Sequence, residues 1–252
     1  MSQTLGQQKA ATRPSHPSFV DLRQFASDVV SGPAICIDGQ TDAFLASRQI
    51  LELPPGPVEI GAIRVEAGTG TVAELQADEF IILCDGSLTL NQQGRTLELV
   101  DGASAVLTAG VGFSWHCSES ATLLYMRYNK GTTGDASLIA IDESATLDPS
   151  GTPAAELLIG PTPQCRNHTD YLSADGEFVC GTWDSTPYQR RPMKFRHYEL
   201  MHLLAGAVKV ENEAGASRTF VKGDIFLVEQ QAQCSWESRE VVKKVYAIYR
   251  PA

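Results

Sequence analysis

The stretch KFRHYELMHLLAG, residues 194–206, decides the fold of this chain, because ELQADEFIILCDG at 74–86 repeats its framework. Glu199 in the later stretch matches Glu79 in the earlier one, and each stands seven residues before the closing glycine. The histidines of the later stretch have no counterpart in the earlier one. The shared framework therefore belongs to the fold, whereas the histidines belong to the second copy alone.

The two stretches are part of a longer internal repeat. Seven landmarks recur at one offset with a single one-residue slip. The pairs are Gly61 and Gly181, Glu79 and Glu199, Gly86 and Gly206, Gly102 and Gly223, Trp115 and Trp236, Tyr125 and Tyr246, and Tyr128 and Tyr249. Around them lie short β-rich runs broken by Gly, Asp and Asn, a pattern typical of strands and turns. Recurrence of this kind predicts a duplicated all-β unit.

The predicted fold class is all-β, with two tandem jelly-roll barrels and few short helices. We expect residues 1–16, which are polar, to be a disordered leader, with the N-terminal barrel at 17–130 and the C-terminal barrel at 131–252. Apolar residues at helical spacing predict one helix over 19–30. The second unit has extra residues around 160–171, which are most simply placed in a surface loop. This loop is a lid, a dimer contact or an inert insertion.

Composition narrows the classes of partner and compartment. The net charge of −10 and the pI near 5.0 argue against nucleic acids and anionic membranes as partners. The first residues lack the apolar core of a secretory signal, so a cytoplasmic protein is expected. Six cysteines are scattered without a CxxC pair, so we expect reduced, mostly buried thiols and no zinc knuckle.

The second unit resembles a known family over residues 178–250. The stretches GTWDS, KFRHYELMHLLAG, KGDIFLVEQ and VVKKVYAIY are similar to those of the ethanolamine-utilisation subfamily of cupins. Residues 58–128 match more weakly, since Ile63 replaces a tryptophan and Ala103 an aspartate. The resemblance implies a bicupin of the RmlC-like cupin superfamily, more distantly similar to ureidoglycine aminohydrolase, a manganese enzyme. It also implies a homodimer, because cupins often pair their barrels edge to edge.

Metal-dependent cupins resemble one another in three histidines and one glutamate that point into the barrel. This chain keeps the glutamates but places other residues at the histidine positions, including Phe113 and Cys234 at the third one. We therefore predict no metal with the usual shell. The alternative is a rearranged site of His197, Glu199 and Cys234, which would suit zinc or another transition metal such as Mn, Fe or Ni.

The second barrel is the better candidate for an active site. His197 and Glu199 are two apart on a predicted strand and so share a face, and Lys194 is expected to act as the cation beside Glu199. These three are the candidate catalytic residues, although an ordinary ion pair predicts the same residues. His202 is expected on the opposite face. The candidate ligand-binding residues are Trp183, Tyr188, Met201, Cys234, Trp236 and Tyr246, although repeated aromatic positions also fit core packing.

Three functions follow from these residues. The leading hypothesis is that the C-terminal barrel binds or transforms a small polar metabolite, while the N-terminal barrel is a structural copy. The alternative is a metal-dependent enzyme, similar to an aminohydrolase, that acts on a small amide or ureide. The third is a non-catalytic scaffold or sensor. The sequence leaves open the ligand, the metal content and the choice between catalysis and binding.

Overall fold

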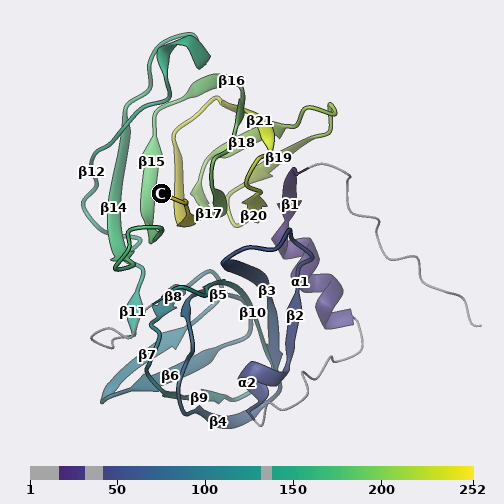
Figure 1. Cartoon of the computed structure of the whole chain (residues 1–252), viewed down its shortest axis with the longest axis vertical. Coiled ribbons are helices and arrows are strands. Elements are labelled where there is room, and N and C mark those ends of the chain that lie inside the picture. The colour runs from purple at the N-terminus through teal and green to yellow at the C-terminus, as the bar shows by residue number, and fades with distance from the viewer. Residues whose placement is uncertain (1–16, 32–41, 132–137) are drawn as a thin grey trace, which may run out of the picture.

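The computed structural model describes residues 17–31, 42–131 and 138–252, which form two stacked β units (Figure 1). The N-terminal unit contains one large and one small sheet, and so does the C-terminal unit. Only short helices accompany them in the described ranges. The predicted all-β class with few short helices is therefore confirmed. The predicted leader at 1–16 lies outside the described residues.

The N-terminal unit contains a six-stranded sheet in the order β11-β8-β5-β10-β3-β2 and a four-stranded sheet in the order β4-β9-β6-β7. All its neighbouring strands run antiparallel. The strands are β2 (Arg48–Ile50), β3 (Val58–Val65), β4 (Gly68–Val72), β5 (Asp78–Asp85), β6 (Leu88–Gln92), β7 (Arg95–Leu99), β8 (Ser104–Leu107), β9 (Phe113–Cys117), β10 (Ala121–Tyr128) and β11 (Ile139–Ala140).

The C-terminal unit repeats this plan with longer edges. Its large sheet has seven strands in the order β1-β20-β17-β22-β15-β14-β12, and its small sheet has the order β13-β16-β21-β18-β19. The strands are β1 (Phe19–Asp21), β12 (Asp148–Pro149), β13 (Leu158–Ile159), β14 (Cys165–Leu172), β15 (Phe178–Ser185), β16 (Tyr188–Lys194), β17 (Tyr198–Ala205), β18 (Ala207–Glu211), β19 (Ser217–Val221), β20 (Ile225–Val228), β21 (Gln233–Ser238) and β22 (Val242–Tyr249).

Each large sheet ends in a strand from the other half of the chain. β1 pairs with β20, so that Val20 lies opposite Leu227, and β11 pairs with β8, so that Ile139 lies opposite Val106. Val106 and Leu227 are equivalent positions of the repeat, so the exchange is reciprocal. The two halves are tied together by these strands across the predicted boundary at residue 130, and the boundary itself stays a prediction.

Two recurring glycines show why the repeat survives in the sequence. Gly86 and Gly206 end β5 and β17 with φ angles of 85° and 78°, a region that L side chains rarely adopt. A Cβ atom at either position would lie 2.3 Å from a backbone oxygen, that of Ser120 or of Val241. Ser120 and Val241 are again one repeat apart. The turn needs glycine at both positions for the same physical reason.

Three short helices accompany the sheets in the residues that the structure describes. They are α1 (Leu22–Ser31), α2 (Ala43–Ala46) and the 3-10 helix η1 (Ala155–Leu157). The helix predicted over 19–30 begins only at Leu22, because residues 19–21 form β1 instead. The Asp42 carboxylate caps α2 by accepting a hydrogen bond from the Phe44 N–H at 2.8 Å.

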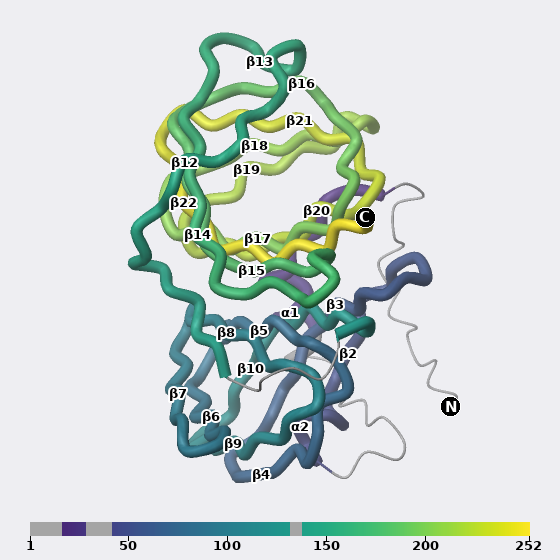
Figure 2. Tube along the Cα trace, turned by 60° about the vertical axis from the view of Figure 1, so that its left-hand side comes forward, coloured from purple at the N-terminus to yellow at the C-terminus, as the bar shows by residue number. Residues whose placement is uncertain are grey.

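The two large sheets pack against each other and form one shared apolar core. Ile60, Phe80 and Leu124 of the N-terminal unit belong to the same buried cluster as Leu200 and Ala247 of the C-terminal unit. Successive side chains of a strand point to opposite faces. Even-numbered residues of β17 therefore face the other unit, while its odd-numbered residues face the interior of the C-terminal barrel. Figure 2 shows β15 and β17 of the C-terminal unit lying next to β5 and β10 of the N-terminal unit.

The extra residues of the second unit differ from the expected loop. Most of the stretch 160–171 belongs to β14, which pairs with β15 along most of its length, starting with Cys165 opposite Ser185. The surface-loop expectation is therefore wrong from Cys165 onward, because these residues pair with β15 and, in part, with β12 in the large sheet. No helix of the described residues is long and apolar enough to cross a membrane.

Candidate functional site

The C-terminal barrel contains a partly open cavity of about 490 Å³. Its walls come from β14, β15, β16, β17, β21 and β22, and the segment 150–153 lies at its border. The side chains that carry charge or an aromatic ring in this wall are Trp183, Tyr188, Arg190, Phe195, His197, Glu199, Trp236, Lys244, Tyr246 and Arg250. A volume of this size suits a small molecule.

Aromatic rings form one part of the wall. The Trp236 ring stacks on Tyr188, with centroids 6.0 Å apart, and meets Trp183 edge to face at 6.4 Å. The Lys244 ammonium lies 4.7 Å from the centroid of Trp183 and 5.2 Å from that of Trp236. These distances fit cation–π contacts, which are strongest away from water. The tryptophans thus position a buried cation at the cavity.

A buried carboxylate lies beside this cation. Lys244 Nζ donates to Glu199 Oε1 at 2.7 Å, and His197 Nε2 lies 3.2 Å from Glu199 Oε2. Burial alone would raise the pKa of Glu199, but the charge of Lys244 and the contact with His197 lower it well below its usual range. Glu199 is therefore ionised at neutral pH. It is suited to accept hydrogen bonds or to orient Lys244, and unsuited to donate a proton.

The structure corrects the expectation that Lys194 pairs with Glu199. Lys194 is exposed at the end of β16 and does not line the cavity, whereas Lys244 makes the ion pair. The reason is strand order, because β22 is the hydrogen-bonded neighbour of β17 and β16 lies in the other sheet. The signal was present in the sequence, since Lys244 precedes Tyr246 by two residues and so shares its face.

The remaining sequence candidates divide between cavity and core. Trp183, Tyr188, Trp236 and Tyr246 line the cavity as expected of ligand-binding residues, although this placement does not test such a role. Met201 and Cys234 do not line it. Met201 is fully buried, with Sδ 3.1 Å from Lys244 Nζ, and Cys234 is fully buried in an apolar cluster. Both belong to the buried apolar cluster of this barrel.

The described residues of the barrel do not form the rearranged metal site that the sequence suggested as an alternative. In the described ranges, no three His, Cys, Asp or Glu side chains come together in a group that could hold a metal ion, so His197, Glu199 and Cys234 do not form one. Burial raises the pKa of the Cys234 thiol to about 11, so the thiolate that zinc needs is disfavoured. The charge of Glu199 is already matched by Lys244.

The N-terminal barrel neutralises its own glutamate in a different way. Glu79 is fully buried and accepts two hydrogen bonds from Arg48, both at 2.8 Å. The Arg48 guanidinium also lies 4.6 Å from the centroid of the Tyr125 ring. Arg48 belongs to β2, whereas Lys244 belongs to β22. Each barrel therefore keeps the inherited glutamate and pairs it with a cation from a different strand.

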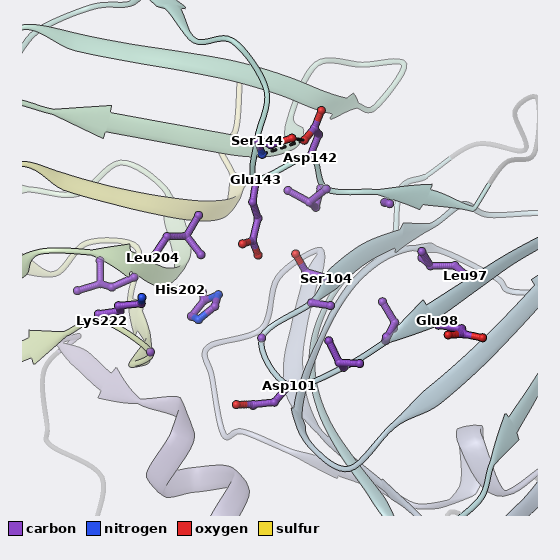
Figure 3. A pocket seen from close by; sticks show the side chains of 18 of the residues that line it. Leu97, Glu98, Asp101, Ser104, Asp142, Glu143, Ser144, His202, Leu204 and Lys222 are labelled. Carbon is purple, nitrogen blue, oxygen red and sulfur yellow. Dashed lines mark hydrogen bonds between the residues drawn. The ribbon is translucent and has the colours of Figure 1, made fainter.

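A second cavity of about 660 Å³ lies at the junction of the two units (Figure 3). His202 lies in it between Lys222 of the C-terminal unit and Asp101 of the N-terminal unit, as Figure 3 shows. The expectation that His202 points away from Glu199 is thereby confirmed. His202 is 6% exposed, and its Nδ1 atom has no hydrogen-bond partner in the part of the chain that the structure describes.

Protonation of His202 should weaken the fold. Burial, helped by the charge of Arg23 and opposed by that of Asp101, lowers the pKa of His202 to about 4. In the unfolded chain, His202 takes up a proton near pH 6.5. The contribution of neutral His202 to the free energy of unfolding is therefore fully present above pH 6.5 and is lost as the pH drops towards 4. Between pH 7.5 and 5, we expect the wild type to lose about 2 kcal/mol more unfolding free energy than His202→Gln. Urea unfolding at both pH values measures this; equal losses would contradict it.

Comparisons with known proteins agree with this fold. Residues 172–246 match the family model of the EutQ-like cupin domain. A DUF861-family protein of unknown function from Pseudomonas syringae pv. tomato str. DC3000 is 27% identical, with a TM-score of 0.81 over 92% of this chain and 100% of that chain. A comparison with curated proteins finds no match.

More distant structures share the architecture. A cupin 2 conserved barrel domain protein from Leptotrichia buccalis is 12% identical, with a TM-score of 0.60 over 96% of this chain and 100% of that chain. A salicylate 1,2-dioxygenase from Pseudaminobacter salicylatoxidans is 11% identical, with a TM-score of 0.54 over 94% of this chain and 87% of that chain. The predicted cupin fold is confirmed, while the likeness to ureidoglycine aminohydrolase stays a prediction.

Proposed function

We propose that the C-terminal barrel of this cupin-fold chain binds or transforms a small polar metabolite in its 490 Å³ cavity. The observation that carries the proposal is the combination of aromatic walls with the buried pair of Lys244 and Glu199. Binding sites for small molecules are mostly apolar and contain a few polar groups in fixed positions. The pair and the tryptophans together give this cavity such a composition.

The N-terminal barrel provides the contrast within the same chain. Its interior holds the fully buried Phe44, which α2 brings into contact with Phe113 at 5.2 Å between ring centroids. Its glutamate, Glu79, is held by Arg48 through both carboxylate oxygens. This side-chain packing supports a structural role for the first barrel and favours the second barrel as the binding site.

The metal-dependent alternative finds less support. An aminohydrolase acting through a metal in this barrel would need a donor set that the described residues do not assemble. The ion pair can interact with a ligand without a metal. The Lys244 ammonium can bind a ligand oxygen, while Glu199 holds the ammonium in position. The central step of the proposal is that the Lys244 ammonium binds a polar group of the ligand and polarises it.

Ligand binding is tested by the thermal stability of the full chain in the presence of a panel of small carboxylates, amides and amines. We expect at least one compound to raise Tm by several degrees at a concentration well above its Kd, because binding stabilises the native state. The variant Trp183→Ala should lose the response, since it removes part of the wall. Trp115→Phe, which changes the only tryptophan of the N-terminal barrel, should keep it. A panel without any response would contradict the proposal.

A further inference from the structure

Arg190 is a buried cation without a carboxylate. It belongs to β16, lines the cavity and is 5% exposed. Its guanidinium lies over the Phe195 ring at 5.3 Å and contacts the hydroxyl of Tyr188, which is a neutral partner. No acidic side chain of the described residues forms an ion pair with Arg190, and its Nη1 atom has no acceptor among them. Buried charges are normally paired.

Arg48 shows how an arginine is accommodated inside the other barrel. Burial works against its charge, but Glu79 overcomes that effect and raises the pKa of Arg48 above its ordinary value. For Arg190, burial dominates and lowers the pKa, despite smaller opposing effects from Tyr188 and Glu199. The two buried arginines therefore differ in their partners, because a carboxylate of the protein pairs with Arg48 and none of the described residues pairs a carboxylate with Arg190.

Trp236 also lacks an acceptor that its repeat partner possesses. In the N-terminal barrel, the Trp115 indole N–H donates to the Asp42 carboxylate at 3.0 Å. In the C-terminal barrel, the Trp236 Nε1 atom is buried and has no acceptor among the described residues. Trp236 lies opposite Arg190 in the strand register, as Trp115 lies opposite Gly70. Where the first barrel has its own carboxylate near the tryptophan, the second has a cation and a cavity.

We propose that the cavity takes a small carboxylate whose oxygens bind the Arg190 guanidinium and the Trp236 indole N–H. This inference rests on the proposed function of the C-terminal barrel and names its ligand class. The buried charges of the wall agree, because Arg190 and Lys244 outnumber Glu199 by one positive charge. A ligand carboxylate balances that charge, and the aromatic rings of the wall cover an apolar body attached to it.

The first experiment varies only the charge of the probe. NMR titrations of the full chain at pH 7.5 would measure Kd for benzoate, benzamide and benzylamine, and for the smaller series of acetate, acetamide and ethylamine. We expect the carboxylate of the better-fitting series to bind at least 10-fold more tightly than its amide, with the amine weakest. Inorganic phosphate serves as a further anion and should bind more weakly than that carboxylate.

The second experiment removes the proposed anchor. Arg190→Met should weaken binding of the carboxylate at least 10-fold and leave binding of the amide within about 2-fold. Arg191→Met is the matched control, because Arg191 is the exposed neighbour on the same strand and does not line this cavity. Without ligand, Arg190→Met should unfold at the same Tm as the wild type or a higher one, since it removes an unpaired buried charge. A purely structural arginine would give a lower Tm.

The outcomes separate the two proposals. Carboxylate selectivity that depends on Arg190 supports both. If amides or amines bind as well as carboxylates, if phosphate binds more tightly, or if Arg190→Met leaves the carboxylate-to-amide ratio unchanged, the carboxylate assignment is overturned while a binding cavity remains. If none of the six organic probes binds the wild type, the carboxylate assignment is overturned, and a silent thermal panel in addition refutes the proposed function.

Discussion

Replacing Arg48 by methionine is expected to lower the free energy of unfolding by about 3–5 kcal/mol. The substitution would leave Glu79, which is fully buried, as a charge without its two 2.8 Å hydrogen bonds from the guanidinium. An isolated charge in a protein interior lowers the free energy of unfolding, because it has lost its hydration and no other charge or hydrogen bond replaces the water. Urea unfolding followed by tryptophan fluorescence measures the loss.

Two further variants make the cause identifiable. Arg64→Met removes an arginine from an exposed pair with Glu66, at a similar distance of 2.9 Å, and should cost less than about 1 kcal/mol. The double variant Arg48→Met/Glu79→Leu removes both buried charges and should recover most of the loss. Equal losses for Arg48→Met and Arg64→Met, or no recovery in the double variant, would show that the buried pair is not the cause.

The sequence predicted the fold well because the repeat constrains the backbone. Gly86 and Gly206 recur since the same turn needs a left-handed residue in both units, and Trp115 and Trp236 recur since they occupy one register position in the small sheets. Each of these constraints fixes the residue type at one position, so it can be recognised in the sequence when the two copies are compared. The strand exchange of β1 and β11 left no comparable signal, because β strands pair through the backbone.

The site was predicted less completely, because its charges do not follow the repeat. The position equivalent to Lys244 is Leu123, and the position equivalent to Arg190 is Gly70. Arg48 stands on an edge strand with no cation at the matching place in the other unit. Comparing the two copies therefore found the shared Glu79 and Glu199 but could not find their partners, which depend on strand neighbours that only the sheet order reveals.

Replacing Lys244 by methionine is expected to lower the free energy of unfolding at pH 7.5 by about 3–5 kcal/mol. Lys244 and Glu199 are 6% and 8% exposed, and they are joined by a 2.7 Å hydrogen bond. The substitution leaves Glu199 with His197 alone. Urea unfolding again gives the measurement, here with Trp183 and Trp236 as reporters next to the altered position.

Lys194→Met is the matched control for Lys244→Met. It removes the same charge from the lysine that the sequence placed beside Glu199, but this lysine is exposed and should contribute less than about 0.5 kcal/mol. The double variant Lys244→Met/Glu199→Gln should recover much of the loss, because it removes the uncompensated charge. A large effect of Lys194→Met, together with a small one of Lys244→Met, would refute the observed pairing.

The pH dependence gives a second test with a defined sign. In the wild type, the pKa of Glu199 lies below its unfolded value near 4.3, so its contribution to stability is complete above that pH and is lost as the pH falls further. In Lys244→Met, burial is no longer opposed by the lysine and raises the pKa of Glu199, so the variant gains a proton and relative stability as the pH falls. The difference in unfolding free energy between wild type and variant should therefore be largest near pH 7.5 and should narrow towards pH 4.

The Lys244→Met/Glu199→Gln variant is the control, because it lacks the titrating carboxylate. Its stability relative to Lys244→Met should fall over the same pH range. A gap that stays constant with pH would show that the loss comes from packing of the lysine stem rather than from the charge of Glu199.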